Sequence, residues 1–169
     1  MNDDKFDINF FLGLALDSNR RSIHKILAFN EQEIENTHDF IQYIFPTIEK
    51  SNYNPNAPLI SENLRRLFSE NEVAQENFCK TCRLFLHFCG FRCAKSTELF
   101  VPKLGGSFLS RPGHNLLRIT RVLNSLNQIG KESCSRKIFS QIEAFNNAYP
   151  GDIPKDTYII WKSTQKNRL

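Results

Sequence analysis

The sequence predicts an all-α protein, a single domain over residues 1–169 that folds as a multi-helix bundle of about six to eight helices. Apolar residues recur along most of the chain at the three- and four-residue spacing of amphipathic helices. Residue types that start and stop helices stand at the ends of these stretches. Hydrophobic residues make up 40% of the chain, enough for one core, and 15 phenylalanines predict that large rigid rings fill it.

Helix boundaries in the first part of the chain come from caps and a proline. Gly13 can stop a short apolar segment at its C-terminal end. Ser22 and Asn30 are good N-caps, and Glu33 completes a capping box with Asn30. Pro46 cannot continue the helix that Asn30 begins. The predicted elements are an apolar segment at 6–12 and helices at 22–29 and 31–45.

The remaining helices have similar signals at their ends. Ser61 and Asn71 can cap two consecutive helices, and Gly90 and Gly130 suit C-terminal caps. Pro154 suits the first turn of a last helix. The helices predicted from these signals lie at 61–70, 72–89, 114–129, 132–148 and 155–162.

Two stretches lack helix signals. Residues 47–58 contain Pro55 and Pro58 among asparagines, which predicts an extended or turning loop. Residues 94–113 contain two prolines and three glycines, which predicts a long irregular loop. A short strand at 99–101 is the only β-structure that the sequence suggests.

Charge and composition limit the classes of function. The net charge is +4, and the basic residues are dispersed apart from short clusters at Arg20-Arg21, Arg65-Arg66 and 162–168. Nucleic-acid-binding proteins usually gather positive charge in a patch, so a solvated surface is favoured over nucleic-acid contact. No window approaches the ~20 apolar residues of a membrane span. The acidic N-terminus and the odd number of cysteines favour an intracellular, cytoplasmic protein.

The cysteines at helical spacing are predicted to be small buried hydrophobic residues. Cys79 and Cys82 have the spacing of a metal-binding pair, but further cysteines continue at offsets of three and four along the same helix face. On a straight helix Cys82 and Cys89 lie about 10 Å apart, whereas four zinc ligands must surround one ion. We therefore expect no metal. The stripe consists of Cys79, Cys82, Leu86, Cys89 and Cys93.

The helix predicted at 31–45 carries the first candidate binding residues. His38 falls on its apolar stripe with Ile34 and Ile41, and Gln42 lies one turn further on, at the edge of the stripe. A histidine on an apolar face is more often a satisfied core residue than a ligand or a base. In either case these side chains need polar partners, and those partners would line a polar pocket.

The helix predicted at 114–129 carries the second set. Arg118 and Arg121 project together on the side opposite its apolar stripe, with His114 near the helix start. Two interpretations stay open: a solvated basic face, or an anion site in which two guanidinium groups bind a carboxylate or phosphate. Asn115 lies nearer the core, where its amide is expected to be buried and hydrogen-bonded. The polar side consists of His114, Arg118, Arg121 and Ser125, and the core side of Leu116, Ile119, Leu123 and Leu126.

No known catalytic motif is present. The sequence lacks a P-loop and the patterns G-x-G-x-x-G, H-E-x-x-H and G-x-S-x-G. We therefore favour a protein without catalytic activity and without a cofactor. The alternative is an enzyme that uses His38 or His114 as a general base beside the arginines.

Three motifs resemble the conserved N-terminal region of the opioid growth factor receptor family. Residues 38–46 are similar to its His-x-aromatic-Ile-Gln-Trp-aliphatic-Phe-Pro motif, with Tyr43 in place of the tryptophan. Residues 54–59 match its Asn-Pro-x-Ala-Pro-Leu loop, and residues 114–123 match its His-Asn-x-Leu-Arg-Ile-Thr-Arg-Ile-Leu helix. The resemblance extends from about residue 6 to residue 161.

The resemblance implies an all-helical domain. Vertebrate members of the family are described as receptors for an enkephalin peptide, associated with the nucleus and perinuclear membranes and with growth inhibition. They carry long additional C-terminal regions, whereas this chain resembles compact members. The resemblance supplies no catalytic or ligand-binding residues to carry over.

Together these observations favour a binding module for a peptide, a protein or an anionic small ligand. We expect the helices that carry the two motifs to pack together, so that His38 and Gln42 meet Asn115 or Arg118 under the loop at 54–59. Weak nucleic-acid contact is a further alternative. The candidate ligand-binding residues are His38, Gln42, Tyr43, His114, Asn115, Arg118 and Arg121.

Overall fold

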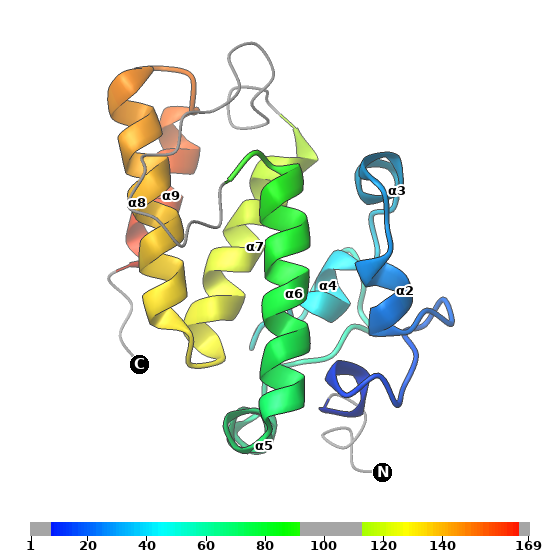
Figure 1. The fold of residues 1–169 in the computed structure, drawn as a ribbon. Coiled ribbons are helices and arrows are strands. Elements are labelled where there is room, and N and C mark those ends of the chain that lie inside the picture. The colour runs from blue at the N-terminus through cyan, green and yellow to red at the C-terminus, as the bar shows by residue number, and fades with distance from the viewer. Residues whose placement is uncertain (1–7, 92–112, 166–169) are drawn as a thin grey trace. The chain divides into compact units, whose positions relative to one another are not determined.

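The structure, a computed structural model, describes residues 8–91 and 113–165. Within these residues helices dominate and no sheet forms, because the β-type pairing there is an isolated parallel bridge between Thr47 and Leu59. The all-α prediction is therefore confirmed. Figure 1 labels the helices α2 (Ile23–Leu27), α3 (Glu31–Asn36), α4 (Ile41–Ile44), α5 (Glu62–Glu70), α6 (Glu72–Phe88), α7 (His114–Gln128), α8 (Glu132–Ala148) and α9 (Lys155–Thr164).

Most helix boundaries follow the predicted caps. The capping box forms, since Asn30 Oδ1 accepts from the Glu33 N–H and Glu33 Oε2 accepts from the Asn30 N–H, both at 2.9 Å. The chain leaves α7 through Gly130 at φ +88°, and the Lys131 N–H then donates to the Leu126 carbonyl at 2.8 Å. This last bond is the long bond of a Schellman motif, which satisfies a carbonyl that the helix leaves open.

The prediction of a single helix over residues 31–45 is wrong. The structure has α3 and α4 instead, separated by a break at residues 37–40. Thr37 ends α3 in an extended conformation, with φ −96° and ψ 116°. His38 lies in this break and is exposed, so the prediction that it points at an apolar face is also wrong. The break accompanies the ion pair of Asp39 with Arg21, a contact between distant segments that helix-end signals do not report.

Several predictions fall on residues that the structure does not describe. The irregular loop at 94–113 lies outside the described residues except for Gly113. The strand at 99–101, Cys93 and the basic residues after 165 also lie outside them. These predictions stay as they are.

The chain divides into two compact units. The first comprises residues 1–85 and 128–130, and the second comprises residues 86–127 and 131–169. The prediction of one domain is not decided by this division. Each unit is described by itself below.

The core of the first unit is built from aromatic rings, as the phenylalanine content predicts. The Phe78 ring lies 5.7 Å from that of Phe11, 5.4 Å from that of Phe68 and 5.9 Å from that of Phe45, all edge-on. Phe45 in turn meets Phe85 at 6.0 Å. Edge-to-face pairs at these distances add stability beyond simple burial.

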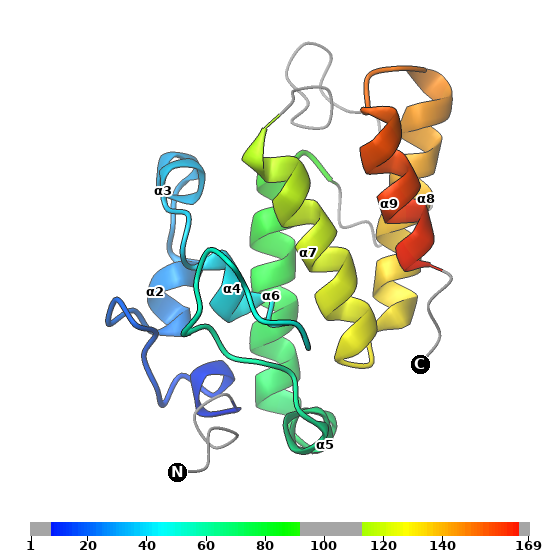
Figure 2. The same ribbon diagram turned by 180° about the vertical axis from the view of Figure 1, so that it is seen from behind.

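In the second unit α9 packs against both α7 and α8. Trp161 of α9 is fully buried, and its Nε1 donates to Thr120 Oγ1 of α7 at 2.7 Å. The ring of Tyr158 stacks on that of Phe139 of α8, with centroids 5.9 Å apart. α8 and α9 accordingly lie side by side in both views (Figure 1 and Figure 2).

The cysteine stripe on α6 is largely buried. Cys82 is 9% exposed and Leu86 is 8% exposed, while Cys79 is half-buried; Cys89, directly after the end of α6, is fully buried. This burial agrees with their prediction as small hydrophobic residues.

Gly13 provides the first testable prediction. It follows a helical turn at 8–11 and has φ +78°, and a Cβ added there would lie 2.5 Å from Nε2 of His24. Gly151 has φ +92° but open space around its Cβ position. We expect Gly151→Ala to lower the free energy of unfolding by about 1–2 kcal/mol, the cost of a left-handed backbone. Gly13→Ala should cost slightly more, because the exposed His24 ring must also turn aside, and urea denaturation measures both variants.

The exposed His24 ring accounts for this difference, so it provides the control. In a Gly13→Ala/His24→Ala double variant the loss should fall to that of Gly151→Ala. If Gly13→Ala and Gly151→Ala have equal effects, the close approach of His24 to Gly13 does not matter for stability.

Candidate functional site

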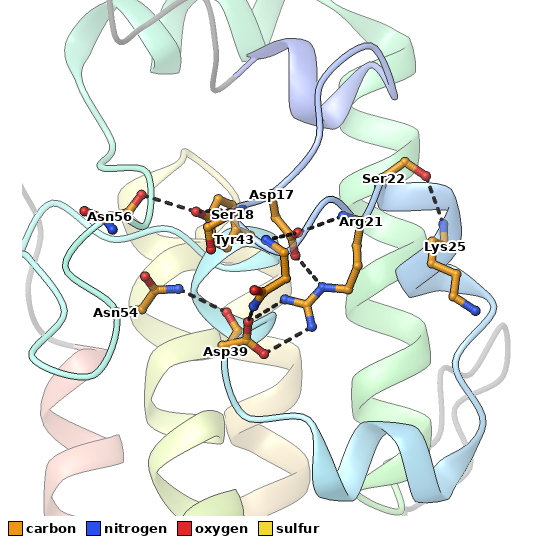
Figure 3. A network of polar contacts seen from close by, with 10 residues as sticks. Asp17, Ser18, Arg21, Ser22, Lys25, Asp39, Tyr43, Asn54 and Asn56 are labelled. Atoms are coloured by element: carbon orange, nitrogen blue, oxygen red, sulfur yellow. Dashed lines mark hydrogen bonds and ion pairs between the residues drawn. The ribbon is translucent and has the colours of Figure 1, made fainter.

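A polar network holds the break between α3 and α4 in the first unit (Figure 3). Arg21 donates to both carboxylate oxygens of Asp39, from Nη1 at 3.1 Å and from Nη2 at 2.7 Å. Its Nε also donates to Asp17 Oδ2 at 2.6 Å. Asn19 Nδ2 donates to Asp39 as well. One guanidinium thus joins two carboxylates that come from different segments of the chain.

Asp17 also shapes the turn that presents Arg21. Its Oδ1 accepts from the backbone N–H of Asn19 at 2.9 Å and from that of Arg21 at 2.8 Å. Arg20, inside this turn, has a positive φ of 59°. Local side-chain bonds of this kind replace the backbone bonds that a helix would supply.

The network shifts the pKa values of both charged partners. Burial by itself raises the pKa of Asp39, but the hydrogen bonds and the charge of Arg21 outweigh burial, so this pKa lies below its ordinary value. Burial lowers the pKa of Arg21, but its bonds to Asp39 and Asp17 reverse this effect and raise it. Both shifts favour the ionised pair.

Tyr43 ties the loops around the network together. The residue is 2% exposed, its hydroxyl donates to the Asn56 carbonyl at 3.3 Å, and the same oxygen accepts from the Ser18 N–H at 3.2 Å. Asn54 Nδ2 donates to the Asp39 carbonyl at 3.3 Å. The loop at 54–59 therefore contacts the 39–43 segment, as Figure 3 shows.

Gln42 lies in the chain between Asp39 and Tyr43, the two residues that are hydrogen-bonded to the 54–59 loop. It is 6% exposed, and no hydrogen-bond partner for its Oε1 lies among the described residues. The expectation that Gln42 lies at the edge of an apolar face is consistent with this burial. This buried amide oxygen can therefore accept a hydrogen bond from a further donor.

On α7 of the second unit, Asn115 and Arg118 are both 5% exposed, and Arg118 Nη1 donates to Asn115 Oδ1 at 3.1 Å. The prediction of a buried, bonded Asn115 is confirmed. Ser125, on the same face as Arg118, is fully buried. The interpretation of this side as a solvated basic face is therefore wrong at Arg118 and Ser125, because the buried arc of α7 is wider than its apolar stripe. His114 and Arg121 are half-buried.

The predicted site residues fall in both compact units. His38, Gln42 and Tyr43 belong to the first unit, and Asn115 and its neighbours on α7 belong to the second. The predicted packing of the two motif helices stays a prediction. Within the first unit the structure brings Tyr43 and the 54–59 loop together, whereas it leaves His38 exposed.

Sequence analysis missed Asp17, Arg21 and Asp39 as members of a site. Asp17 and Arg21 have a four-residue spacing that hints at a pair, but no local pattern connects Arg21 with Asp39, 18 residues later. The described residues contain no group of three His, Cys, Asp or Glu side chains that could hold a metal ion.

Comparisons with known proteins give one consistent result. Residues 2–142 match the family model described as the opioid growth factor receptor (OGFr) conserved region. The chain is 30% identical over 107 residues to the opioid growth factor receptor-like protein 1 of Mus musculus, which is 60% of this chain and 23% of that protein. It is 31% identical over 110 residues to the opioid growth factor receptor of Rattus norvegicus, which is 61% of this chain and 18% of that protein.

The matched region thus spans less than a quarter of the length of these relatives. No solved structure matches the chain. In the described part of the chain, none of the helices combines the length and apolar character that crossing a membrane requires.

Proposed function

Because the chain belongs to the opioid growth factor receptor conserved-region family, we propose that it is a binding module that captures a peptide or protein segment through an anionic group. A relative carries the word receptor in its name, which favours binding over catalysis. Side chains on α7 have the chemistry to recognise a carboxylate, since guanidinium groups bind it with two parallel hydrogen bonds.

The observation that carries the proposal is a row of donors along one face of α7. Because residues 114–128 form one continuous helix, His114, Arg118 and Arg121 follow one another at offsets of four and three on the same face. Arg118 is buried against Asn115, whereas His114 and Arg121 are half-buried. Arg121 is thus the more exposed of the two arginines, and Arg118 adds a second positive charge on the same face of the helix.

We expect Arg121→Ala to weaken the binding of an anionic peptide by roughly 10- to 100-fold, the value of one charged hydrogen bond of about 1.5–3 kcal/mol. The probe is an enkephalin pentapeptide with a free C-terminal carboxylate, titrated into the full chain by calorimetry. The same pentapeptide with an amidated C-terminus should bind the wild type as weakly as the free acid binds Arg121→Ala.

Arg136→Ala is the matched control, because Arg136 is an exposed arginine on α8 of the same unit and carries the same charge. It should bind the probe like the wild type. Equal affinity for the acid and the amide, or no binding of either, contradicts the proposal. If DNA binds instead, with an affinity that falls steeply as salt rises, the basic face serves nucleic-acid contact.

A further inference from the structure

We propose that Ser69 is a phosphorylation site for a serine kinase that recognises acidic residues, and that Arg65 binds the attached phosphate. The site lies where α5 ends and α6 begins, and it is independent of the donor row on α7. Three observations carry the proposal: the acidic residues after Ser69, the exposure of Ser69, and the lack of an anionic partner for Arg65 among the described residues.

Acidic residues follow Ser69 at the first and third positions, as Glu70 and Glu72. No other serine or threonine of the 169-residue sequence has a carboxylate at both of these positions. Both glutamates are exposed. A kinase whose substrate groove is lined with lysine and arginine recognises carboxylates after the serine, because charge-assisted hydrogen bonds to them are strong. The sequence after Ser69 therefore fits an acid-directed kinase.

The Ser69 side chain is accessible at the end of a helix. The residue is exposed, and its hydroxyl donates to the Arg66 carbonyl at 2.7 Å. Ser69 is next to the last residue of α5, and Asn71 leaves this helix in an extended conformation, with φ −121° and ψ 104°. Because helix ends fray more readily than helix centres, residues 69–72 can open to fit the groove of a kinase.

Arg65 lies one helical turn before Ser69. Its Nε is buried without an acceptor, and no carboxylate of the described residues forms an ion pair with its guanidinium. The next residue shows what this spacing allows, since Arg66 Nη1 lies 2.9 Å from Glu70 Oε2 at the same offset of four. A phosphoserine and a glutamate have similar lengths, so a phosphate on Ser69 can meet Arg65 as Glu70 meets Arg66.

The modification transfers the γ-phosphoryl group of ATP. A bond forms between Ser69 Oγ and the γ-phosphorus, the bond from that phosphorus to the bridging oxygen of ADP breaks, and the hydroxyl proton passes to the base of the kinase. The phosphate adds about −1.5 to −2 charges near pH 7. Glu70 and the C-terminal end of α5 repel this charge, and the guanidinium of Arg65 offsets the repulsion.

The first test incubates the full chain with ATP and a purified acid-directed serine kinase, and mass spectrometry locates the phosphate. We expect the phosphate on Ser69, so Ser69→Ala should abolish its incorporation there. Glu72→Gln should slow the incorporation about 10-fold, the value of one charged hydrogen bond.

Ser163→Ala is the matched control and should leave the incorporation unchanged. Ser163 is exposed, is also next to the last residue of its helix, α9, and donates to the Ile160 carbonyl at 2.6 Å. Unlike Ser69, it is followed by no acidic residue in 164–169.

The second test measures the contact with Arg65 by phosphorus NMR of the phosphorylated chain. The pKa of the phosphate should be lower in the wild type than in Arg65→Met, because a nearby guanidinium favours the doubly charged phosphate. Glu70, Glu72 and Arg66 are the same in both proteins, so the difference between the two pKa values isolates the effect of Arg65.

Two results would overturn the proposal. If the kinase leaves Ser69 unmodified, or modifies Glu72→Gln as fast as the wild type, the acidic residues do not direct it to this site. If the phosphate has the same pKa in the wild type and in Arg65→Met, Arg65 does not bind it. Circular dichroism of Ser69→Ala and Glu72→Gln should match the wild type, since both residues are exposed.

Discussion

Trp161→Ala is expected to lower the free energy of unfolding by about 3–5 kcal/mol, the range for truncating a fully buried tryptophan. Trp161 has no exposed surface, and its Nε1 is bonded to Thr120 Oγ1 at 2.7 Å. Its removal leaves a large cavity between α9 and its neighbours in the second unit. Because Trp161 is the only tryptophan, urea denaturation must be followed by circular dichroism.

Two further variants separate packing from the hydrogen bond. Thr120→Val keeps the shape of the side chain and leaves the indole N–H without its acceptor, which should cost about 1–3 kcal/mol. Ile160→Ala removes a neighbouring side chain that is 50% exposed and should have a small effect. If Trp161→Ala costs no more than Ile160→Ala, the indole does not hold α9 in place.

The fold could be predicted because helix ends depend on local chemistry. The capping box of Asn30 and Glu33 involves residues three apart, and the stop at Gly130 requires only a residue that tolerates a positive φ. The break at 37–40 could not be predicted in this way. It accompanies the pairing of Arg21 with Asp39, a contact between segments that apolar periodicity does not report.

Only the apolar part of the candidate site on α7 could be predicted, because periodicity reports apolar burial. The apolar stripe of α7 correctly placed Leu116 and Ile119 in the core and Asn115 beside them. The same stripe assigned Arg118 and Ser125 to a solvated side of the helix, although both are buried. Polar side chains at the edge of a buried arc are buried as well when they have partners, as Arg118 has in Asn115.

The pairing of Arg21 with Asp17 and Asp39 is the basis of the second large effect expected on stability. Arg21→Met keeps the apolar stem and removes the charge, so it leaves two carboxylates without their common cation. The Asp17 side chain has no exposed surface, while that of Asp39 is 35% exposed. We expect a loss of about 2–4 kcal/mol, below the value for a fully buried pair because solvent reaches Asp39. Arg20→Met is the matched control, since Arg20 is exposed.

The pH dependence of this loss identifies its cause. The pKa of Asp39 in the folded protein is lower than that of an ordinary aspartate, so ionised Asp39 stabilises the fold fully above the pKa of the unfolded chain. This contribution disappears as pH falls through the lower pKa of the folded state. The difference in unfolding free energy between the wild type and Arg21→Met should therefore be constant near neutral pH and shrink below about pH 4. A difference that stays constant into acid would show that the loss does not come from the ion pair of Arg21 with Asp39.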